Sequence, residues 1–180
     1  MTIITKKICL LGDFNVGKTS LVRRFVEDTF SDRYLSTVGV KVSRKSIEIE
    51  TDTDTDSHQV NLLVWDLEGS TKFKSITPSY LKGASGSIIV ADLTRVETFN
   101  NLNQHIKLFV EVNPHGVIII ALNKADLIPQ EKLSQLIENY NSDRFNHCEQ
   151  IVGIYTTSAK IGDNVVKIFD KLAQVVTLFT

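Results

Sequence analysis

One segment, residues 12–19, constrains the fold of this chain more than any other. It reads Gly-Asp-Phe-Asn-Val-Gly-Lys-Thr and fits the pattern G-x-x-x-x-G-K-[ST] at every fixed position. In this pattern the backbone N–H groups of a loop surround the α- and β-phosphates of a nucleotide. The lysine reaches the β- and γ-phosphates, and the last hydroxyl binds Mg²⁺. The pattern predicts a phosphate loop whose ligand contacts involve Asp13, Phe14, Asn15, Val16, Gly17, Lys18, Thr19 and Ser20.

The sequence on both sides of this segment supports the interpretation. Residues 3–11 form an apolar run rich in Ile and Leu around Lys6 and Lys7, which favours a β-strand. After the segment, apolar residues recur at a spacing of three and four from Leu21 to Val26, which indicates a helix. A glycine loop between a strand and a helix directs the helix N-terminus at the anion. The alternative, a chance match in an ordinary glycine turn, is disfavoured by this context.

The rest of the chain alternates between strand and helix patterns. Nearly continuous apolar runs at 86–93 and 117–122 are typical of strands buried on both faces of a parallel sheet. Another strand is expected at 60–66, and two strand pieces around residues 43–46. Helical spacing marks residues 102–110, 133–140 and 165–176. Alternating strands and helices predict an α/β fold with right-handed crossovers, in which the phosphate loop lies at the C-terminal edge of the sheet.

The overall composition limits the class of protein. The chain has 180 residues, which suits one domain, and 20 Lys and Arg against 21 Asp and Glu give no electrostatic reason to expect nucleic acid. Two cysteines, Cys9 and Cys148, make no disulfide framework and fit a reducing cytosol. The sequence has no 18-residue apolar stretch and no signal-peptide pattern. The last four residues contain no cysteine for prenylation, so we expect no lipid anchor on this chain. We therefore expect a cytoplasmic protein that reaches membranes only through its partners.

The biased segment at 51–59 begins Thr-Asp-Thr-Asp-Thr-Asp and resembles the start of a calcium-binding loop. That interpretation fails, because Ser57 stands where the loop needs glycine and Leu63 where it needs a bidentate glutamate. An acidic hairpin tip in solvent is the better prediction.

A second motif, Asn123-Lys124-Ala125-Asp126, narrows the ligand. It directly follows the apolar run at 117–122, so it is expected at the same sheet edge as the phosphate loop. A carboxylate at Asp126 would accept hydrogen bonds from N1–H and the 2-amino group of guanine. Adenine has neither group and would leave the carboxylate unpaired, which is costly in a buried site. The two motifs together therefore predict a guanine nucleotide, with the stem of Lys124 covering the base.

With these motifs the chain resembles the Ras superfamily of small GTPases, and within it the Rab branch, over essentially its whole length. The shared motifs come in family order, at residues 12–19, 34–39, 65–69, 123–126 and 158–160, and residues 80–84 are similar to a segment common in Rab proteins. The resemblance implies a mostly parallel six-stranded sheet flanked by about five helices, in a single G domain spanning 1–180. It also implies GTP or GDP with Mg²⁺ as ligands, and effector, exchange-factor and activating-protein partners.

The resemblance further implies roles for individual residues. Thr37 would ligate Mg²⁺ and sense the γ-phosphate, Asp66 would hold the metal through water, and the Gly69 N–H would contact the γ-phosphate. The expected metal ligands are thus Thr19, Thr37 and Asp66, and the expected catalytic positions are Lys18, Thr37, Gly69 and Ser70. From the residues alone, a plain loop threonine at position 37 stays open.

At the base end, the resemblance implies that Phe30 stacks on the base edge. Ser158, Ala159 and Lys160 would form the last base-contact loop, with the Ala159 N–H facing the guanine O6. A simple core role for Phe30 is the alternative. Together with Asn123, Lys124 and Asp126, these residues complete the expected guanine site.

Departures from the family pattern at Phe14, Glu68 and Ser70 bear on hydrolysis, as does Arg33 near Tyr34, and Asn15 stands where relatives often have glycine. Ser70 stands where the family has the Gln that orients the attacking water, and Phe14 stands where close relatives have a small residue. Phe14 is expected to hinder an arginine supplied by an activating protein. Glu68 would repel the nucleotide, orient water or point to solvent, and we favour solvent. Arg33 would act as an arginine supplied in cis or remain a solvated loop residue, which we favour.

Three functions follow from these features. The first is a nucleotide switch with slow GTP hydrolysis, in which Thr37 and Gly69 are ordered by GTP and released after hydrolysis. The second is a GTP-binding scaffold with negligible turnover, suggested by Ser70 and Phe14. The third, an ATP-using kinase, requires adenine and conflicts with the expected role of Asp126.

Overall fold

A computed structural model of the chain describes residues 3–31, 37–50, 57–69, 77–141, 145 and 148–178. Within these residues six strands form one sheet in the order β2-β3-β1-β4-β5-β6. The pair β2–β3 is antiparallel, and the other neighbouring pairs are parallel. The strands are β1 (Ile3–Gly12), β2 (Val40–Glu50), β3 (Ser57–Leu67), β4 (Gly86–Asp92), β5 (Val117–Asn123) and β6 (Ile151–Thr156).

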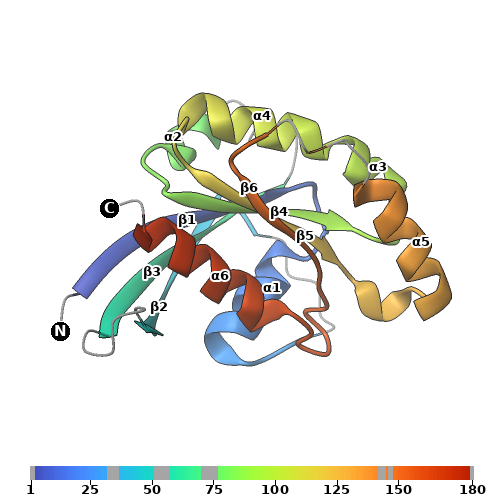
Figure 1. Cartoon of the computed structure of the whole chain (residues 1–180), viewed down its shortest axis with the longest axis horizontal. Coiled ribbons are helices and arrows are strands. Elements are labelled where there is room, and N and C mark those ends of the chain that lie inside the picture. Colours follow the sequence, from blue (N-terminus) through green and yellow to red (C-terminus); the bar gives the residue numbers. More distant parts are fainter. Residues whose placement is uncertain are drawn as a thin grey trace.

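Helices cover both faces of this sheet (Figure 1). They are α1 (Lys18–Glu27), α2 (Thr77–Leu81), α3 (Val96–Asn100), α4 (Leu102–Val112), α5 (Gln130–Asn141) and α6 (Val165–Leu178). Helices α1 and α6 pack on one face, and α2 to α5 lie on the other. The fold is therefore the α/β architecture with a mostly parallel six-stranded sheet that the sequence predicted.

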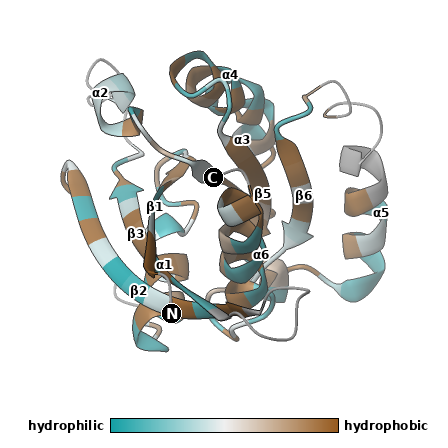
Figure 2. Cartoon of the chain, turned by 60° about the vertical axis from the view of Figure 1, so that its left-hand side comes forward, coloured by the Kyte–Doolittle hydropathy of each residue, from teal (hydrophilic) through white to brown (hydrophobic). Residues whose placement is uncertain are grey.

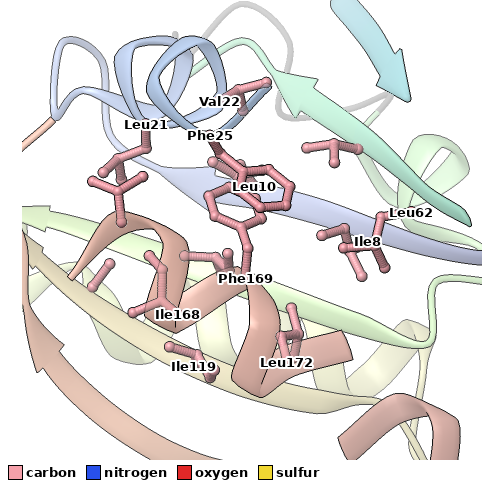
Figure 3. Close-up of a cluster of buried hydrophobic side chains, with 14 of the residues drawn as sticks. Ile8, Leu10, Leu21, Val22, Phe25, Leu62, Ile119, Ile168, Phe169 and Leu172 are labelled. Atoms are coloured by element: carbon pink, nitrogen blue, oxygen red, sulfur yellow. The ribbon is translucent and has the colours of Figure 1, made fainter. Parts of the chain in front are cut away.

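Two apolar cores hold the helices on the sheet. On the α1–α6 side, the rings of Phe25 and Phe169 stack with their centroids 4.0 Å apart, in the same cluster as Leu10 of β1 and Ile119 of β5 (Figure 3). Burial of each such side chain contributes about 1.5–3 kcal/mol to folding. The stack fixes α1, which begins at Lys18, against α6 and the sheet. The position of the phosphate loop therefore depends on this core.

Strands β4 and β5 are buried at every residue, as their continuous apolar sequences predicted. Strand β2, at the edge of the sheet, instead alternates between hydrophilic and hydrophobic residues along its length (Figure 2). Cys9 is buried in β1, where burial raises the pKa of its thiol to about 12, and both Cys9 and Cys148 are free thiols.

The structure corrects one strand boundary and adds elements that the pattern did not indicate. Residues 40–50 form one continuous strand, not two pieces, and this strand pairs with β3 without a break from Val40 to Glu50. Its polar residues are accommodated because the strand lies at the edge of the sheet. The pattern did not single out the short helices α2 and α3 or the strand β6. The acidic segment at 51–56 lies outside the described residues.

The C-terminal ends of the parallel strands meet at one edge of the sheet, where ligands bind in open α/β folds. Gly12, Asp92 and Asn123 end three neighbouring strands there. Within the described residues, no helix is long and apolar enough to cross a membrane.

Candidate functional site

The phosphate loop turns at the end of β1 and leads directly into α1. The Lys18 side chain is buried, and its Nζ donates hydrogen bonds to the carbonyls of Gly12 (2.8 Å) and Asp13 (2.7 Å). Burial lowers the pKa of Lys18 to about 8, although the carboxylates of Asp66 and Asp13 oppose the shift. A buried ammonium group surrounded mainly by backbone carbonyls is suited to receive the negative charge of a phosphate.

The phosphate loop is tied to the Asn123 motif by close packing. Gly17 has φ 101°, and a Cβ at this position would lie 2.2 Å from Asn123 Nδ2, so only glycine fits. Asn123 Nδ2 donates to the Val16 carbonyl at 3.0 Å, and its Oδ1 accepts from the N–H of Ala159 at 3.3 Å. Asn123 therefore holds three loops together: the phosphate loop, its own motif and residues 158–160.

Three oxygen-bearing side chains meet at the N-terminus of α1. Thr19 Oγ1 lies 2.6 Å from Asp66 Oδ2 and 2.7 Å from Thr37 Oγ1, and the Thr37 hydroxyl donates to the same Asp66 oxygen at 3.2 Å. Two hydroxyls and a carboxylate are hard oxygen donors, the type that Mg²⁺ prefers.

The other Asp66 oxygen supports a cation at this point. Asp66 Oδ1 is buried and has no hydrogen-bond partner among the described residues. Burial also raises the pKa of Asp66, and the hydrogen bonds from Thr19 and Thr37 and the charge of Lys18 only partly oppose this. A divalent cation would satisfy the orphan oxygen and favour the ionised carboxylate. The residues present therefore fit Mg²⁺ held by Thr19, Thr37 and Asp66.

The segment after β3 packs against the phosphate loop. A Cβ at Gly69 would lie 2.5 Å from both the Asp13 carbonyl oxygen and Lys18 Nζ, so glycine is required for this approach. Glu68 does not point to solvent as expected. Its Oε2 accepts a hydrogen bond from the Gly39 N–H at 2.8 Å, and its own N–H donates to the Gly39 carbonyl at 2.9 Å. Glu68 thus links the segment after β3 to the start of β2, because its carboxylate satisfies the backbone donor of Gly39.

The Asn123 motif and residues 158–160 form the other end of the site. Asp126 Oδ1 accepts a hydrogen bond from Ser158 Oγ at 2.5 Å, and the Lys124 ammonium donates to the Asn15 carbonyl at 3.0 Å. Phe30 is partly buried against the core and also borders the cavity, while its stacking on a base stays a prediction. The Ala159 N–H is engaged by Asn123 here, so its contact with a base stays a prediction.

These groups surround a cavity of about 450 Å³, which we call the main cavity because most of the expected site residues line it. Its volume lies within the range of ligand sites, about 300–1,000 Å³. A second cavity of about 590 Å³ shares Phe14, Glu68 and Gly69 with the main cavity. Of the expected site residues, those lining the main cavity are Phe14, Asn15, Gly17, Lys18, Thr19, Ser20, Phe30, Thr37, Gly69, Asn123, Lys124, Asp126, Ala159 and Lys160. Val16 is instead fully buried in the core, Ser158 is buried behind Asp126, and Asp66 lies beneath the two threonines.

Comparison with known proteins places this site in a family. Residues 7–126 match the family described as Roc, the Ras of Complex domain of DAPkinase. The chain belongs to the Ras-related small GTPases of the Rab type. It is 35% identical to Ras-related protein Rab-13 of Rattus norvegicus over 97% of this chain and 81% of that protein. It is 34% identical to Ras-related protein Rab-22A of Homo sapiens, over 93% of this chain and 81% of that protein. It is also 34% identical to GTP-binding protein ypt1 of Schizosaccharomyces pombe, over 91% of this chain and 75% of that protein.

In this Rab-type GTPase, the side chain of Asp13 faces away from the main cavity. Asp13 Oδ2 accepts a hydrogen bond from Asn101 Nδ2 at 2.7 Å, and Oδ1 lies 2.9 Å from His105 Nε2. Asn101 and His105 are one helical turn apart at the start of α4, so one helix face meets the loop. Neither residue carried a motif that could have predicted this contact.

Acid stability is expected to depend on Asp13. Burial alone would raise its pKa, but the hydrogen bonds from His105 and Asn101 outweigh burial and lower it below 3.8. A carboxyl group whose pKa is lower in the folded than in the unfolded state stabilises the fold at pH values above its unfolded pKa. This stabilisation is lost as the pH falls through the folded pKa. Asp13→Asn should therefore flatten the loss of stability below about pH 4. Urea unfolding midpoints measured at several pH values around and below pH 4 test this prediction. The exposed Asp163→Asn serves as the control, and parallel curves for Asp13→Asn and wild type would refute the assignment.

Two arginines of this Rab-type GTPase contact the site loops and were not predicted. Arg24 of α1 donates from Nε to the Ala159 carbonyl (2.9 Å) and from Nη2 to the Lys160 carbonyl (2.6 Å). Arg95, between β4 and α3, donates from Nη2 to the Phe14 carbonyl at 2.8 Å. Neither lies in a recognisable motif, so only the tertiary arrangement identifies them. Ser70 and Arg33 lie outside the described residues.

Proposed function

We propose that this chain is a guanine-nucleotide switch, one G domain over residues 1–180, that binds GTP with Mg²⁺ and hydrolyses it slowly to GDP. The observation that carries the proposal is the shared cavity: Lys18 and Asp126 line the same space, and Asn123 ties the two motifs together. A phosphate-binding group and a carboxylate suited to guanine thus lie at opposite parts of one site.

At the base end, Asp126 accepts hydrogen bonds from N1–H and the 2-amino group of guanine, and Ser158 orients that carboxylate. Lys124 and Phe30 flank the base with their apolar parts, and the Ala159 N–H reaches O6. The relative named GTP-binding protein ypt1 supports the same choice of nucleotide.

At the phosphate end, Thr19, Thr37 and Asp66 would hold Mg²⁺, which would neutralise charge on the β- and γ-phosphates. Thr37 and the Gly69 N–H also sense the γ-phosphate, so the segments that carry them change conformation when the γ-phosphate is lost. Effectors, exchange factors and activating proteins read the surface around residues 34–42 and 65–82. We place the protein in the cytoplasm, in trafficking or signalling, with membrane contact through partners.

The alternative function is a GTP-binding scaffold without useful turnover. Phe14, whose side chain is 45% exposed, borders the main cavity, and this observation favours the alternative because the ring narrows access for an arginine from an activating protein. Such an arginine contributes about 10³–10⁵ to the rate. Ser70 is too short to orient water as a glutamine does.

Single-turnover GTP hydrolysis separates the two functions. We expect the wild-type rate at or below the roughly 10⁻⁴ s⁻¹ of Ras-type proteins, and a rise of about ten-fold or more in Ser70→Gln, because the longer amide positions the attacking water. Ser134→Gln, on the exposed face of α5, is the matched control. A wild-type rate equal to that of an ordinary Ras-type protein would exclude the scaffold. No rise in Ser70→Gln would show that the missing glutamine does not limit hydrolysis.

A further inference from the structure

A single buried carboxylate, Asp92, connects the base-recognition motif to the phosphate loop. Asp92 ends β4, and its side chain is 1% exposed. Its Oδ2 pairs with Lys124 Nζ at 2.7 Å and with Arg95 Nε at 3.1 Å, while its Oδ1 accepts from the N–H and hydroxyl of Thr94. The carboxylate is fully engaged, so both cations are held in fixed places.

Each of the two cations also donates to the phosphate loop. Arg95 Nη2 binds the Phe14 carbonyl at 2.8 Å, and Lys124 Nζ binds the Asn15 carbonyl at 3.0 Å. The carbonyls of two successive residues are thus anchored to one buried charge. Asn15, which carries the second of these carbonyls, has φ 61°, a left-handed conformation that Asn adopts more readily than most residues other than glycine.

Anchoring a carbonyl also orients the N–H across the same peptide plane. The described peptide bonds are trans, so the N–H of each peptide points opposite to its carbonyl. Arg95 lines a second cavity beside Asp13 and His105, whereas Asn15 lines the main cavity. Because Arg95 holds the Phe14 carbonyl from the side of the second cavity, we expect the Asn15 N–H, on the other side of the same peptide plane, to face the main cavity. Lys124 holds the Asn15 carbonyl, and with it the peptide plane that carries the Val16 N–H.

We propose that Arg95 is a positioning residue for nucleotide binding, which holds the Asn15 N–H toward the phosphates by bridging Asp92 and the Phe14 carbonyl. The inference rests on the proposed function, since it concerns the same nucleotide. It requires an arginine, because Nε and Nη2 of one planar group reach the two partners at once, and a lysine has only one nitrogen.

Three variants test this role. Arg95→Ala removes the bridge, and Arg95→Lys keeps a positive charge beside Asp92 but cannot make both bonds. Glu97→Gln is the matched control, because it alters the other charged partner of Arg95, 3.9 Å from Nη1, and leaves the bridge intact. We expect Arg95→Ala and Arg95→Lys to release GDP about ten- to a hundred-fold faster than wild type, and Glu97→Gln to release it at the wild-type rate.

Amide NMR of the GDP-bound protein gives the readout that a purely structural role would not produce. In both Arg95 variants the Asn15 amide resonance and the β-phosphorus resonance of GDP shift, while the Val16 amide, held through Lys124, stays in place. Wild-type release rates with an unmoved Asn15 amide would overturn the proposal. Equal shifts of both amides with a lowered melting temperature would also overturn it. If the wild-type chain binds no GDP at all, the proposed function fails first, and the role of Arg95 fails with it.

Discussion

Replacing Asp126 with alanine is expected to weaken GDP binding by about two to four orders of magnitude. Two hydrogen bonds from guanine to a carboxylate contribute about 1.5–3 kcal/mol each, and their loss leaves the base without its main point of recognition. Asp126 lines the main cavity and its Oδ1 is already oriented by Ser158 at 2.5 Å, so little reorganisation accompanies binding.

The comparison of GDP with inosine diphosphate makes this test specific. Inosine lacks the 2-amino group, so the wild-type protein should prefer GDP, and Asp126→Ala should bind both equally weakly. Competition against a fluorescent GDP analogue measures both affinities. Glu111→Gln, on the exposed part of α4, controls for the loss of an acidic side chain. A variant that keeps the wild-type preference for GDP would show that Asp126 does not read the base.

Replacing Thr19 with alanine is expected to remove most of the effect of Mg²⁺ on nucleotide affinity. In the structure the Thr19 hydroxyl lies 2.6 Å from Asp66 and 2.7 Å from Thr37, at the centre of the oxygen cluster. In the proposed site the cation would lose a ligand, and Asp66 would lose its shorter hydrogen bond and keep the 3.2 Å bond from Thr37. We expect GTP dissociation in the presence of Mg²⁺ to accelerate by about 10²-fold or more.

Measuring GTP dissociation with Mg²⁺ and with a chelator tests the Thr19 prediction. Wild type should release GTP much faster with the chelator, and Thr19→Ala should release it at similar rates in both conditions. Thr19→Ser keeps the hydroxyl and should behave as wild type, which separates the ligand role from a packing role. A large Mg²⁺ effect retained in Thr19→Ala would remove Thr19 from the metal site.

The sequence was sufficient where a local pattern carries its own physical requirement. The G-x-x-x-x-G-K-[ST] pattern placed the turn between β1 and α1, and the continuous apolar runs placed the buried strands β4 and β5. The α/β fold is confirmed because alternating strand and helix patterns leave few other arrangements. Short elements such as α2 and α3 have five residues each, too few to show helical periodicity.

The sequence was insufficient where a contact depends on side chains far apart in the chain. His105 meets Asp13 across 92 positions, and Arg95 meets Phe14 across 81, so no spacing rule connects them. Glu68 was expected to face solvent because a carboxylate near phosphate is unfavourable. The structure instead gives it the Gly39 N–H as a partner, which only the tertiary arrangement could reveal.

The central claim is that this chain binds a guanine nucleotide through one site that joins Lys18 to Asp126. Its most direct test is the identity of the nucleotide bound to the protein purified in Mg²⁺, determined by chromatography after denaturation. We predict close to one guanine nucleotide per chain, GTP if hydrolysis is very slow and GDP if it turns over. A bound adenine nucleotide, or a protein that neither carries nor takes up GDP, would contradict the claim.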